Sequence, residues 1–194
     1  TNRVKPADYW LSLWRGKQAA DFSRFVKLNT SLPVFDILRE SGVKTVCDAA
    51  CGFGKFSALL SHHGFRVYGF DFSEDSVNLT RDLLSKLELP YVNYQVCSIT
   101  DIQYDDEMFD AVVARSVLDH LSVADARVAL KELFRITKDG GLINVTFDSI
   151  EKEDREAPHK VLDDGSYLYT ESDRAGLLFH YYEDQEIEAL LDGK

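Results

Sequence analysis

The segment Val46-Cys47-Asp48-Ala49-Ala50-Cys51-Gly52-Phe53-Gly54 decides how this chain folds. A short apolar run ends at the acidic Asp48, and a loop of small residues with Gly52 and Gly54 leads into a helical pattern. A strand that stops at a glycine-rich turn and continues into a helix builds nucleotide pockets in α/β sheets. Asp48 stands where a phosphate-binding loop disfavours negative charge, so the segment favours a cationic ligand that has no phosphate.

The remaining sequence alternates between short apolar runs and amphipathic helical patterns. Strands are predicted at 45–48, 66–71, 92–97, 109–114 and 142–147, with helices between them, the last of which ends at Gly140-Gly141. This alternation predicts an α/β fold of three layers with a mostly parallel central sheet covered on both faces. Right-handed crossovers place the carboxyl ends of the strands along one edge, where such sheets bind ligands.

The length of 194 residues is sufficient for one domain with its own core. We expect a single domain over 1–194, with an N-terminal helical cap at 1–30, a ligand-binding core at 43–148, and a lid and substrate-side insertion at 150–182. Residues 150–164 read as a polar loop. Two strands are predicted at 166–170 and 177–182, and an acidic helix at 183–191.

Charge and cysteine content restrict the partners. Lys and Arg number 22 against 33 Asp and Glu, a formal net charge of -11, which argues against nucleic-acid partners and anionic membrane surfaces. The odd count of three cysteines, without a Cys/His ligand spacing, predicts reduced thiols and no metal site, as in a cytoplasmic protein. No apolar run approaches the length of a membrane span, and the start does not resemble a signal peptide.

Taken in order, several stretches of the chain resemble the class I S-adenosylmethionine (SAM)-dependent methyltransferases. They are VCDAACGFG at 46–54, VYGFDFS at 67–73, CSITDI at 97–102 followed by MFDAVVARSVLDHL at 108–121, and LKELFRITKDGGLINVTF at 130–147. The resemblance implies a Rossmann-like, seven-stranded mixed sheet with SAM over the strand ends. It also implies transfer of a methyl group to a small-molecule acceptor by in-line displacement. SAM carries an ammonium and a sulfonium, which suits Asp48. The family's two C-terminal antiparallel strands are missing from this chain or replaced by 166–182.

The resemblance also implies which residues contact the cofactor. Asp48 would stand near the methionine ammonium, Asp71 would accept the ribose hydroxyls, and Phe72 would flank the adenine. Two positions depart from the family pattern: Ala50 replaces a loop glycine, and Ser98 stands where an Asp is frequent. The full set of expected cofactor-binding residues is Asp48, Ala49, Ala50, Gly52, Gly54, Asp71, Phe72, Ser98, Ile99 and Arg115.

The sequence does not identify the catalytic group. His120, Asp119 and His180 are candidates, each with a structural alternative such as helix entry or core packing. A hydroxyl acceptor requires a base, whereas a thiolate or carboxylate acceptor does not.

Two other functions remain open at this stage. The stretch from Gly52 to Ser57 comes within one residue of a dinucleotide fingerprint, so an NAD(P)-dependent oxidoreductase is one alternative, which Asp48 disfavours. A non-catalytic SAM-binding protein is the other. The chain is expected to be a monomer or a homodimer. The apolar strand at 142–147, if it lies at a sheet edge, requires either cover from 160–182 or a dimer contact.

Overall fold

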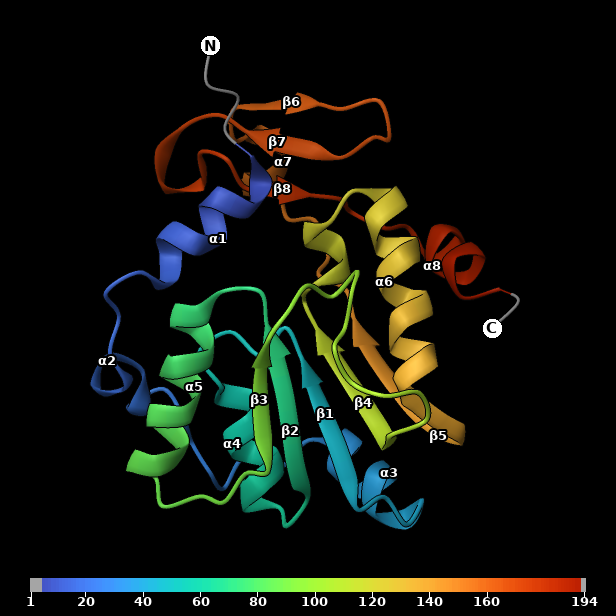
Figure 1. Ribbon diagram of the computed structural model, residues 1–194. Helices are drawn as coiled ribbons and strands as arrows, with labels where there is room; N and C mark the ends of the chain where they lie inside the picture. Colours follow the sequence, from blue (N-terminus) through green and yellow to red (C-terminus); the bar gives the residue numbers. More distant parts are fainter. Residues whose placement is uncertain (1–4, 193–194) are drawn as a thin grey trace.

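The computed structural model describes residues 5–192 and has a five-stranded parallel sheet at its centre (Figure 1). The spatial order of the strands is β3-β2-β1-β4-β5, with parallel pairing throughout. Strands β2 and β3 are added on one side of β1, and β4 and β5 on the other. The switch point of the strand order therefore lies between β1 and β4, and α/β sheets open a ligand crevice at such a point. The strands are β1 (Thr45–Ala49), β2 (Arg66–Asp71), β3 (Asn93–Val96), β4 (Phe109–Arg115) and β5 (Thr137–Thr146).

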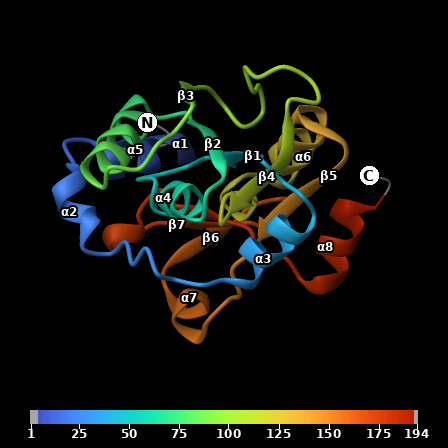
Figure 2. The ribbon, with the colours of Figure 1, turned by 90° about the horizontal axis from the view of Figure 1, so that it is seen from below.

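Helices cover both faces of this sheet, as the alternation of the sequence predicts. On β4, Val113 packs into the core cluster beneath α3 (Pro33–Glu40), α4 (Lys55–His62) and α5 (Glu74–Lys86). Val112 points to the other face, into the cluster formed by α6 (Val123–Ile136) and by Leu190 of α8 (Asp184–Leu191). Figure 2 shows α3 and α4 on the opposite side of the sheet from α6. The period of two along each strand therefore builds two separate cores.

Beyond the carboxyl ends of the strands lies a second, antiparallel sheet, with α1 beside it (Figure 1). The backbone N–H of His180 donates to the carbonyl of Asp119 (2.7 Å), and the N–H of Val123 donates to Asp164 (3.0 Å), which attaches this sheet to the core. The additional elements are α1 (Pro6–Trp14), α2 (Ala19–Ser23), η1 (Leu118–His120), α7 (Lys152–Glu156), β6 (His159–Val161), β7 (Tyr167–Tyr169), η2 (Ser172–Arg174) and β8 (Leu178–Phe179).

The structure corrects three details of the sequence interpretation. Helix α6 ends at Ile136 rather than at Gly140-Gly141, because the glycine pair lies inside β5 at a register shift against β4. A Cβ on Gly141 would lie 2.9 Å from the carbonyl of Asp110, so glycine there permits a close approach of two backbones. Residues 150–164 contain α7 and β6 rather than a loop only. The resemblance implied seven strands, whereas the central sheet of the described residues has five.

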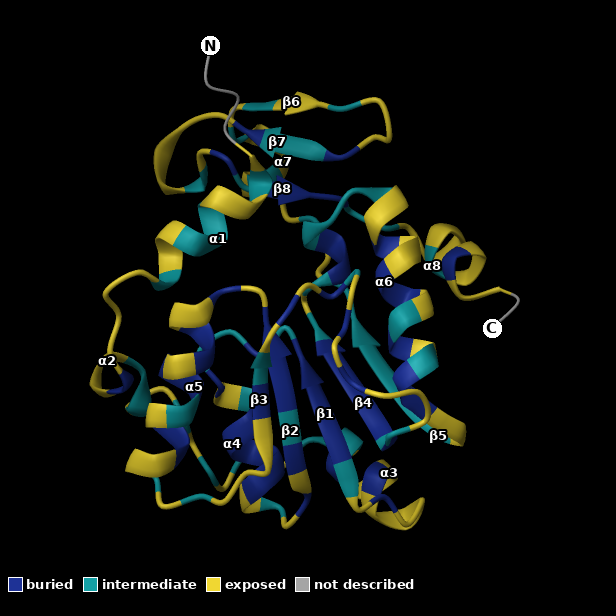
Figure 3. Ribbon diagram, in the orientation of Figure 1, coloured by how far each residue is buried: buried dark blue, intermediate teal, exposed yellow. Residues whose placement is uncertain are grey.

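Strand β5 is the last strand of the central sheet and is less buried than β1, β2 and β4. Figure 3 shows β1, β2 and β4 mostly buried and β5 only partly buried, as expected for the last strand of a sheet. The Tyr182 ring packs against Phe147 at the carboxyl end of β5 (5.0 Å between centroids). Within residues 5–192, β4 is the one strand that pairs with β5. Residues 160–182 were expected to cover this edge, and of these Tyr182 contacts Phe147, the residue that follows β5.

The Asp110 carboxylate connects the amino ends of β1, β4 and β5. It accepts the N–H groups of Lys44 and Thr45 (both 2.9 Å) and an ion pair from Lys138 (2.7 Å). The hydrogen bond from Lys138 is the main reason that the pKa of Asp110 lies below its ordinary value. We expect Asp110→Ala to lower the free energy of unfolding by about 1.5–3 kcal/mol at pH 7, measured by urea titration.

The pH dependence of this loss tests its origin. A depressed folded-state pKa gives stability that is present above the unfolded value of about 3.9 and is lost as pH falls further. The difference between wild type and Asp110→Ala should therefore shrink below about pH 4. Lys138→Ala removes only the half-exposed partner and should cost about 1 kcal/mol or less. Equal losses for both variants would show that the backbone N–H groups do not depend on the carboxylate.

Candidate active site

The loop after β1 is held at the Gly52 peptide. The N–H of Gly52 donates to Asp71 (3.0 Å), and its carbonyl accepts the hydroxyls of Ser76 (2.5 Å) and Thr80 (3.0 Å) from α5. Gly52 itself has φ +57°, in the left-handed region that glycine adopts without strain. The loop therefore has one defined path between the ends of β1 and β2.

Ala50 occupies the same left-handed region without being a glycine. Its φ is +54°, which costs an L-residue roughly 1–2 kcal/mol. The departure from the family pattern at this position therefore keeps the backbone conformation of the loop and adds strain to it.

Asp48 at the end of β1 is a buried carboxyl group. It is 3% exposed and accepts the Ser57 hydroxyl from α4 (2.5 Å). Burial raises the pKa of Asp48 to about 7, and the nearby Asp71 adds to this, while the Ser57 hydrogen bond opposes it. An ionised Asp48 is thus costly to the free protein, and an adjacent cation would offset that cost.

Asp71 ends the neighbouring strand β2 and is 4% exposed. Its two carboxylate oxygens accept the N–H groups of Gly52 and Ser73 (both 3.0 Å). Burial raises the pKa of Asp71, and these hydrogen bonds oppose the shift. The Ser76 hydroxyl and the Phe72 N–H also act on this carboxylate and lower its pKa, so a ligand hydroxyl would share its oxygens with these donors.

The other expected cofactor residues lie around this pair of acids. Phe72 is 36% exposed next to Asp71, and Ile99 is buried after β3. Ser98 is exposed, and its hydroxyl lies 2.8 Å from that of Thr100. The guanidinium of Arg115, the last residue of β4, lies 4.6 Å from the ring centre of Phe56. Of the remaining expected residues, Ala49 is the last residue of β1, and Gly54 is the N-cap of α4, where the loop ends.

His120 follows β4 in a one-turn helix and is half-buried between two aromatic rings. Its ring centre lies 4.7 Å from Trp10 of α1 and 4.5 Å from Phe179 of β8. Nδ1 lies 3.2 Å from the carbonyl of Leu178, which only accepts, so we assign the proton to Nδ1 and a free lone pair to Nε2. Burial lowers the pKa of His120, which keeps the ring neutral at pH 7.

The other two catalytic candidates have structural contacts. Asp119 is fully buried, and one of its oxygens accepts the N–H of Asp148 (2.9 Å). Burial raises the pKa of Asp119 to about 6. His180 is 4% exposed, with Ser166 Oγ at 3.0 Å from Nδ1 and Glu186 Oε1 at 3.2 Å from Nε2. Both ring nitrogens of His180 are therefore engaged.

Sequence reasoning did not locate a cavity of about 500 Å³ between α1, the end of β5 and the small sheet. Its aromatic residues were noted in the sequence, but its acids come from segments whose contact the sequence pattern does not reveal. Phe179 connects the cavity to His120. The cavity residues used below are Tyr9, Asp148, Asp154, Tyr169, Asp173, Arg174, Phe179 and Tyr181.

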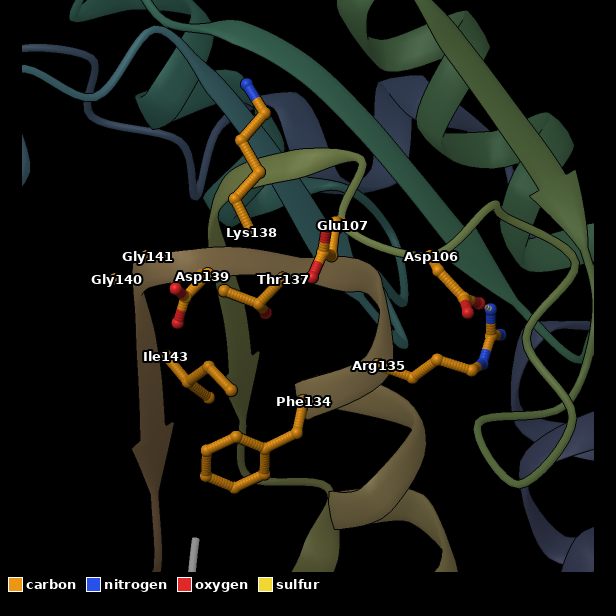
Figure 4. A pocket seen from close by; sticks show the side chains of 10 residues that line it. All are labelled: Asp106, Glu107, Phe134, Arg135, Thr137, Lys138, Asp139, Gly140, Gly141 and Ile143. Carbon is orange, nitrogen blue, oxygen red and sulfur yellow. Dashed lines mark hydrogen bonds and ion pairs between the residues drawn. The ribbon is translucent and has the colours of Figure 1, made fainter.

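A larger hollow of about 890 Å³ lies at the opposite end of β4 and β5 (Figure 4). It contains two cationic side chains, and both are already paired: Arg135 with Asp106 and Glu132, and Lys138 with Asp110. It is distant from the strand ends where the acids converge, so its size does not make it the site.

The fold and the acids at the switch point define the class of a Rossmann-like enzyme that binds a cationic nucleoside. Residues 47–145 match the family described as "Methyltransferase domain", about half of the chain. The chain therefore belongs to the class I SAM-dependent methyltransferases, whose cofactor is SAM.

Individual relatives are distant or partial. The ubiquinone biosynthesis O-methyltransferase of Coxiella burnetii is 32% identical over 98 residues, which are 50% of this chain and 41% of that protein. The chain thus matches about two fifths of the length of this relative.

Two solved structures have a similar fold. A SAM-dependent methyltransferase from Methanosarcina mazei is 21% identical, with a TM-score of 0.67 over 83% of this chain and 82% of that one. A 1,6-didemethyltoxoflavin-N1-methyltransferase from Burkholderia thailandensis is 16% identical, and its structure contains 1,6-didemethyltoxoflavin and S-adenosylhomocysteine. Its TM-score is 0.65, over 95% of this chain and 75% of that one.

The donor set of the site fits SAM. Two carboxylates suit a ligand with an ammonium, a sulfonium and two ribose hydroxyls, and they disfavour a pyrophosphate. A Cβ on Gly52 would lie 3.5 Å from the Trp14 ring, so α1 contacts the loop at this residue.

All three cysteines are free and buried. Among the helices of residues 5–192, none has both the length and the apolarity that crossing a bilayer requires.

The raised pKa of Asp48 predicts that this residue reduces the stability of the cofactor-free protein. Its folded-state pKa of about 7 exceeds the unfolded value of about 3.9, so the destabilisation grows between pH 4 and 7 and then stays constant. We expect Asp48→Asn to raise the free energy of unfolding by about 1–3 kcal/mol at pH 8 and to change it little near pH 4. Urea titration at both pH values measures this.

Asp110→Asn is the matched control, because its folded-state pKa is depressed rather than raised. That variant should lose stability at pH 8. A loss of similar size for Asp48→Asn would contradict the cost assigned to the buried Asp48 carboxyl.

Proposed function

We propose that this chain transfers the methyl group of SAM to a small molecule bound in the cavity beside His120. The observation that carries the proposal is the convergence of Asp48 and Asp71 on the loop fixed at Gly52. The family match supports the cofactor. The names of the Coxiella and Burkholderia proteins, which refer to ubiquinone biosynthesis and to a didemethyltoxoflavin, support a small-molecule acceptor.

In this proposal the loop and strand ends hold the cofactor. Asp71 accepts the ribose hydroxyls, and Phe72 flanks the base. Asp48 supplies the negative charge that faces the methionine ammonium, directly or through water. Ala49, Ala50, Gly52 and Gly54 contribute loop backbone. Ser98, Ile99 and Arg115 complete the rim.

His120 is the residue we propose as general base for a hydroxyl or protonated amine acceptor. SAM supplies an electrophilic methyl group on a neutral leaving group, so the protein need not provide an acid. The chain must align the acceptor with that methyl group, and positioning alone can supply about 7 kcal/mol or more. His120 Nε2 then accepts the acceptor's proton, while the Leu178 carbonyl holds the ring through Nδ1.

The two alternative functions are less consistent with the structure. An NAD(P)-dependent oxidoreductase would place a pyrophosphate against Asp48, and the family match favours SAM instead. A non-catalytic SAM-binding protein has the same loop and acids, but it gives no role to a neutral His120 whose ring contacts Phe179 of the cavity.

Cofactor binding is tested through Asp71. We expect S-adenosylhomocysteine to bind in calorimetry and NAD to give no heat. Asp71→Asn should weaken S-adenosylhomocysteine binding by about 10–100-fold, because the amide replaces an acceptor oxygen with a donor. Asp82→Asn, on the exposed side of α5, is the matched control and should bind normally. Binding of NAD in place of the nucleoside, or an unchanged affinity in Asp71→Asn, would reject the cofactor assignment.

The role of His120 is tested by His120→Gln on any phenol or catechol that the wild type methylates. We expect kcat to fall by about 100-fold or more with unchanged cofactor affinity, and the loss of rate at low pH to disappear. His62→Gln, at the exposed end of α4, is the control and should keep full activity. If His120→Gln keeps the wild-type pH profile, His120 is not the base.

A further inference from the structure

The cavity beside His120 is lined by four aromatic side chains, Tyr9, Tyr169, Phe179 and Tyr181. The rings of Phe179 and Tyr181 are stacked on each other, with their centres 4.2 Å apart and an interplanar angle of 15°. The hydroxyl of Tyr169 lies 2.9 Å from that of Tyr181 and donates to the carbonyl of Asp154 (3.0 Å), which holds these rings in place. A lining of fixed aromatic rings favours an aromatic ligand. The cavity volume of about 500 Å³ suits a small molecule.

The charges of the cavity are unbalanced. Three carboxylates, Asp148, Asp154 and Asp173, face one guanidinium, Arg174. Arg174 is already paired with Asp154 at 2.7 Å. Neither Asp148 nor Asp173 has an ion pair with a basic side chain among residues 5–192; each accepts a serine hydroxyl, from Ser116 (3.2 Å) and Ser172 (3.1 Å) respectively. Both side chains are exposed, and within the described residues their two negative charges have no cationic partner.

These two carboxylates come from different segments of the chain. Asp148 follows β5 of the central sheet, and Asp173 lies in η2, between β7 and β8 of the small sheet. The charge of Asp173 also contributes to the raised pKa of Tyr9 on α1, after burial as the main cause. A cation inside the cavity would be attracted by both acids and by the faces of the tyrosine rings.

We propose that the methyl acceptor is a small aromatic molecule that carries a cationic amine. The proposal rests on the proposed function, since it assigns the substrate class of the same site. The ring packs against the aromatic side chains that line the cavity, of which Phe179 also contacts His120, and the amine compensates Asp148 and Asp173. The cavity rejects the corresponding carboxylate because it would meet two like charges.

The test uses three probes with one aromatic ring and different charges: tyramine, 4-ethylphenol and 3-(4-hydroxyphenyl)propionate. Binding of each to the protein saturated with S-adenosylhomocysteine is measured by calorimetry or by ligand-observed NMR. We expect tyramine to bind at least about tenfold more tightly than the carboxylate, with the neutral phenol between them. The preference for tyramine should decrease with added salt.

Variants separate the cavity from the general negative charge of the protein. Asp148→Asn combined with Asp173→Asn should abolish the preference for tyramine. Asp163→Asn, in the exposed connection between β6 and β7, removes a charge of the same kind and should leave the preference unchanged.

Each outcome has a defined meaning. Equal binding of tyramine and the carboxylate, no binding of any probe, or a preference that survives the double substitution overturns the substrate class, while bound S-adenosylhomocysteine leaves the proposed cofactor site intact. Failure of S-adenosylhomocysteine to bind in the first step overturns the proposed function itself. The inference is supported if the wild type prefers tyramine and the variant with both Asp148→Asn and Asp173→Asn loses this preference.

Discussion

The Gly52 peptide is fixed from both sides, and the site depends on that constraint. Its N–H is held by Asp71 at the end of β2, and its carbonyl by two hydroxyls of α5. Three elements that are separate in sequence thus meet at one peptide group. The loop runs beside Asp48 and Asp71, two carboxyl groups that the parallel pairing of β1 with β2 places at neighbouring strand ends.

This arrangement stores electrostatic cost in the free protein. Burial raises the pKa of both acids, the charge of Asp71 adds to the shift of Asp48, and no basic side chain forms an ion pair with either of them among residues 5–192. Asp110, at the other end of the same sheet, is the opposite case: its carboxylate accepts hydrogen bonds from Lys44, Thr45 and Lys138, and its pKa is lowered. The sheet is therefore stabilised at its amino ends and strained at its carboxyl ends, as functional sites commonly are.

The sequence predicts the central sheet well because its strands are short apolar runs bounded by glycine or acidic residues. Strand β2 is predicted with its observed bounds, since Gly64 and the acid Asp71 delimit it. The prediction fails at Gly140-Gly141, because glycine signals both a helix end and a strand bulge, and only the contact with the Asp110 carbonyl distinguishes them. Strand β6 has no apolar alternation, since Val161 is 63% exposed, and it was missed for that reason. The acidic cavity depends on contacts between distant segments, which no local pattern encodes.

The three catalytic candidates form one structural unit rather than three alternatives. His180 connects Ser166, which precedes β7, to Glu186 of α8, and its backbone N–H holds the carbonyl of Asp119. Asp119 in turn holds the N–H of Asp148, at the end of β5. These contacts fix β8 against η1, and the next residue in η1 is His120, whose ring then meets Phe179. Both ring nitrogens of His180 are engaged in this attachment, whereas Asp119 uses one carboxylate oxygen and its other oxygen, Oδ1, is buried without a hydrogen-bond partner among the described residues. Of the two histidines, His120 is the one whose Nε2 has the lone pair that the proposed base requires.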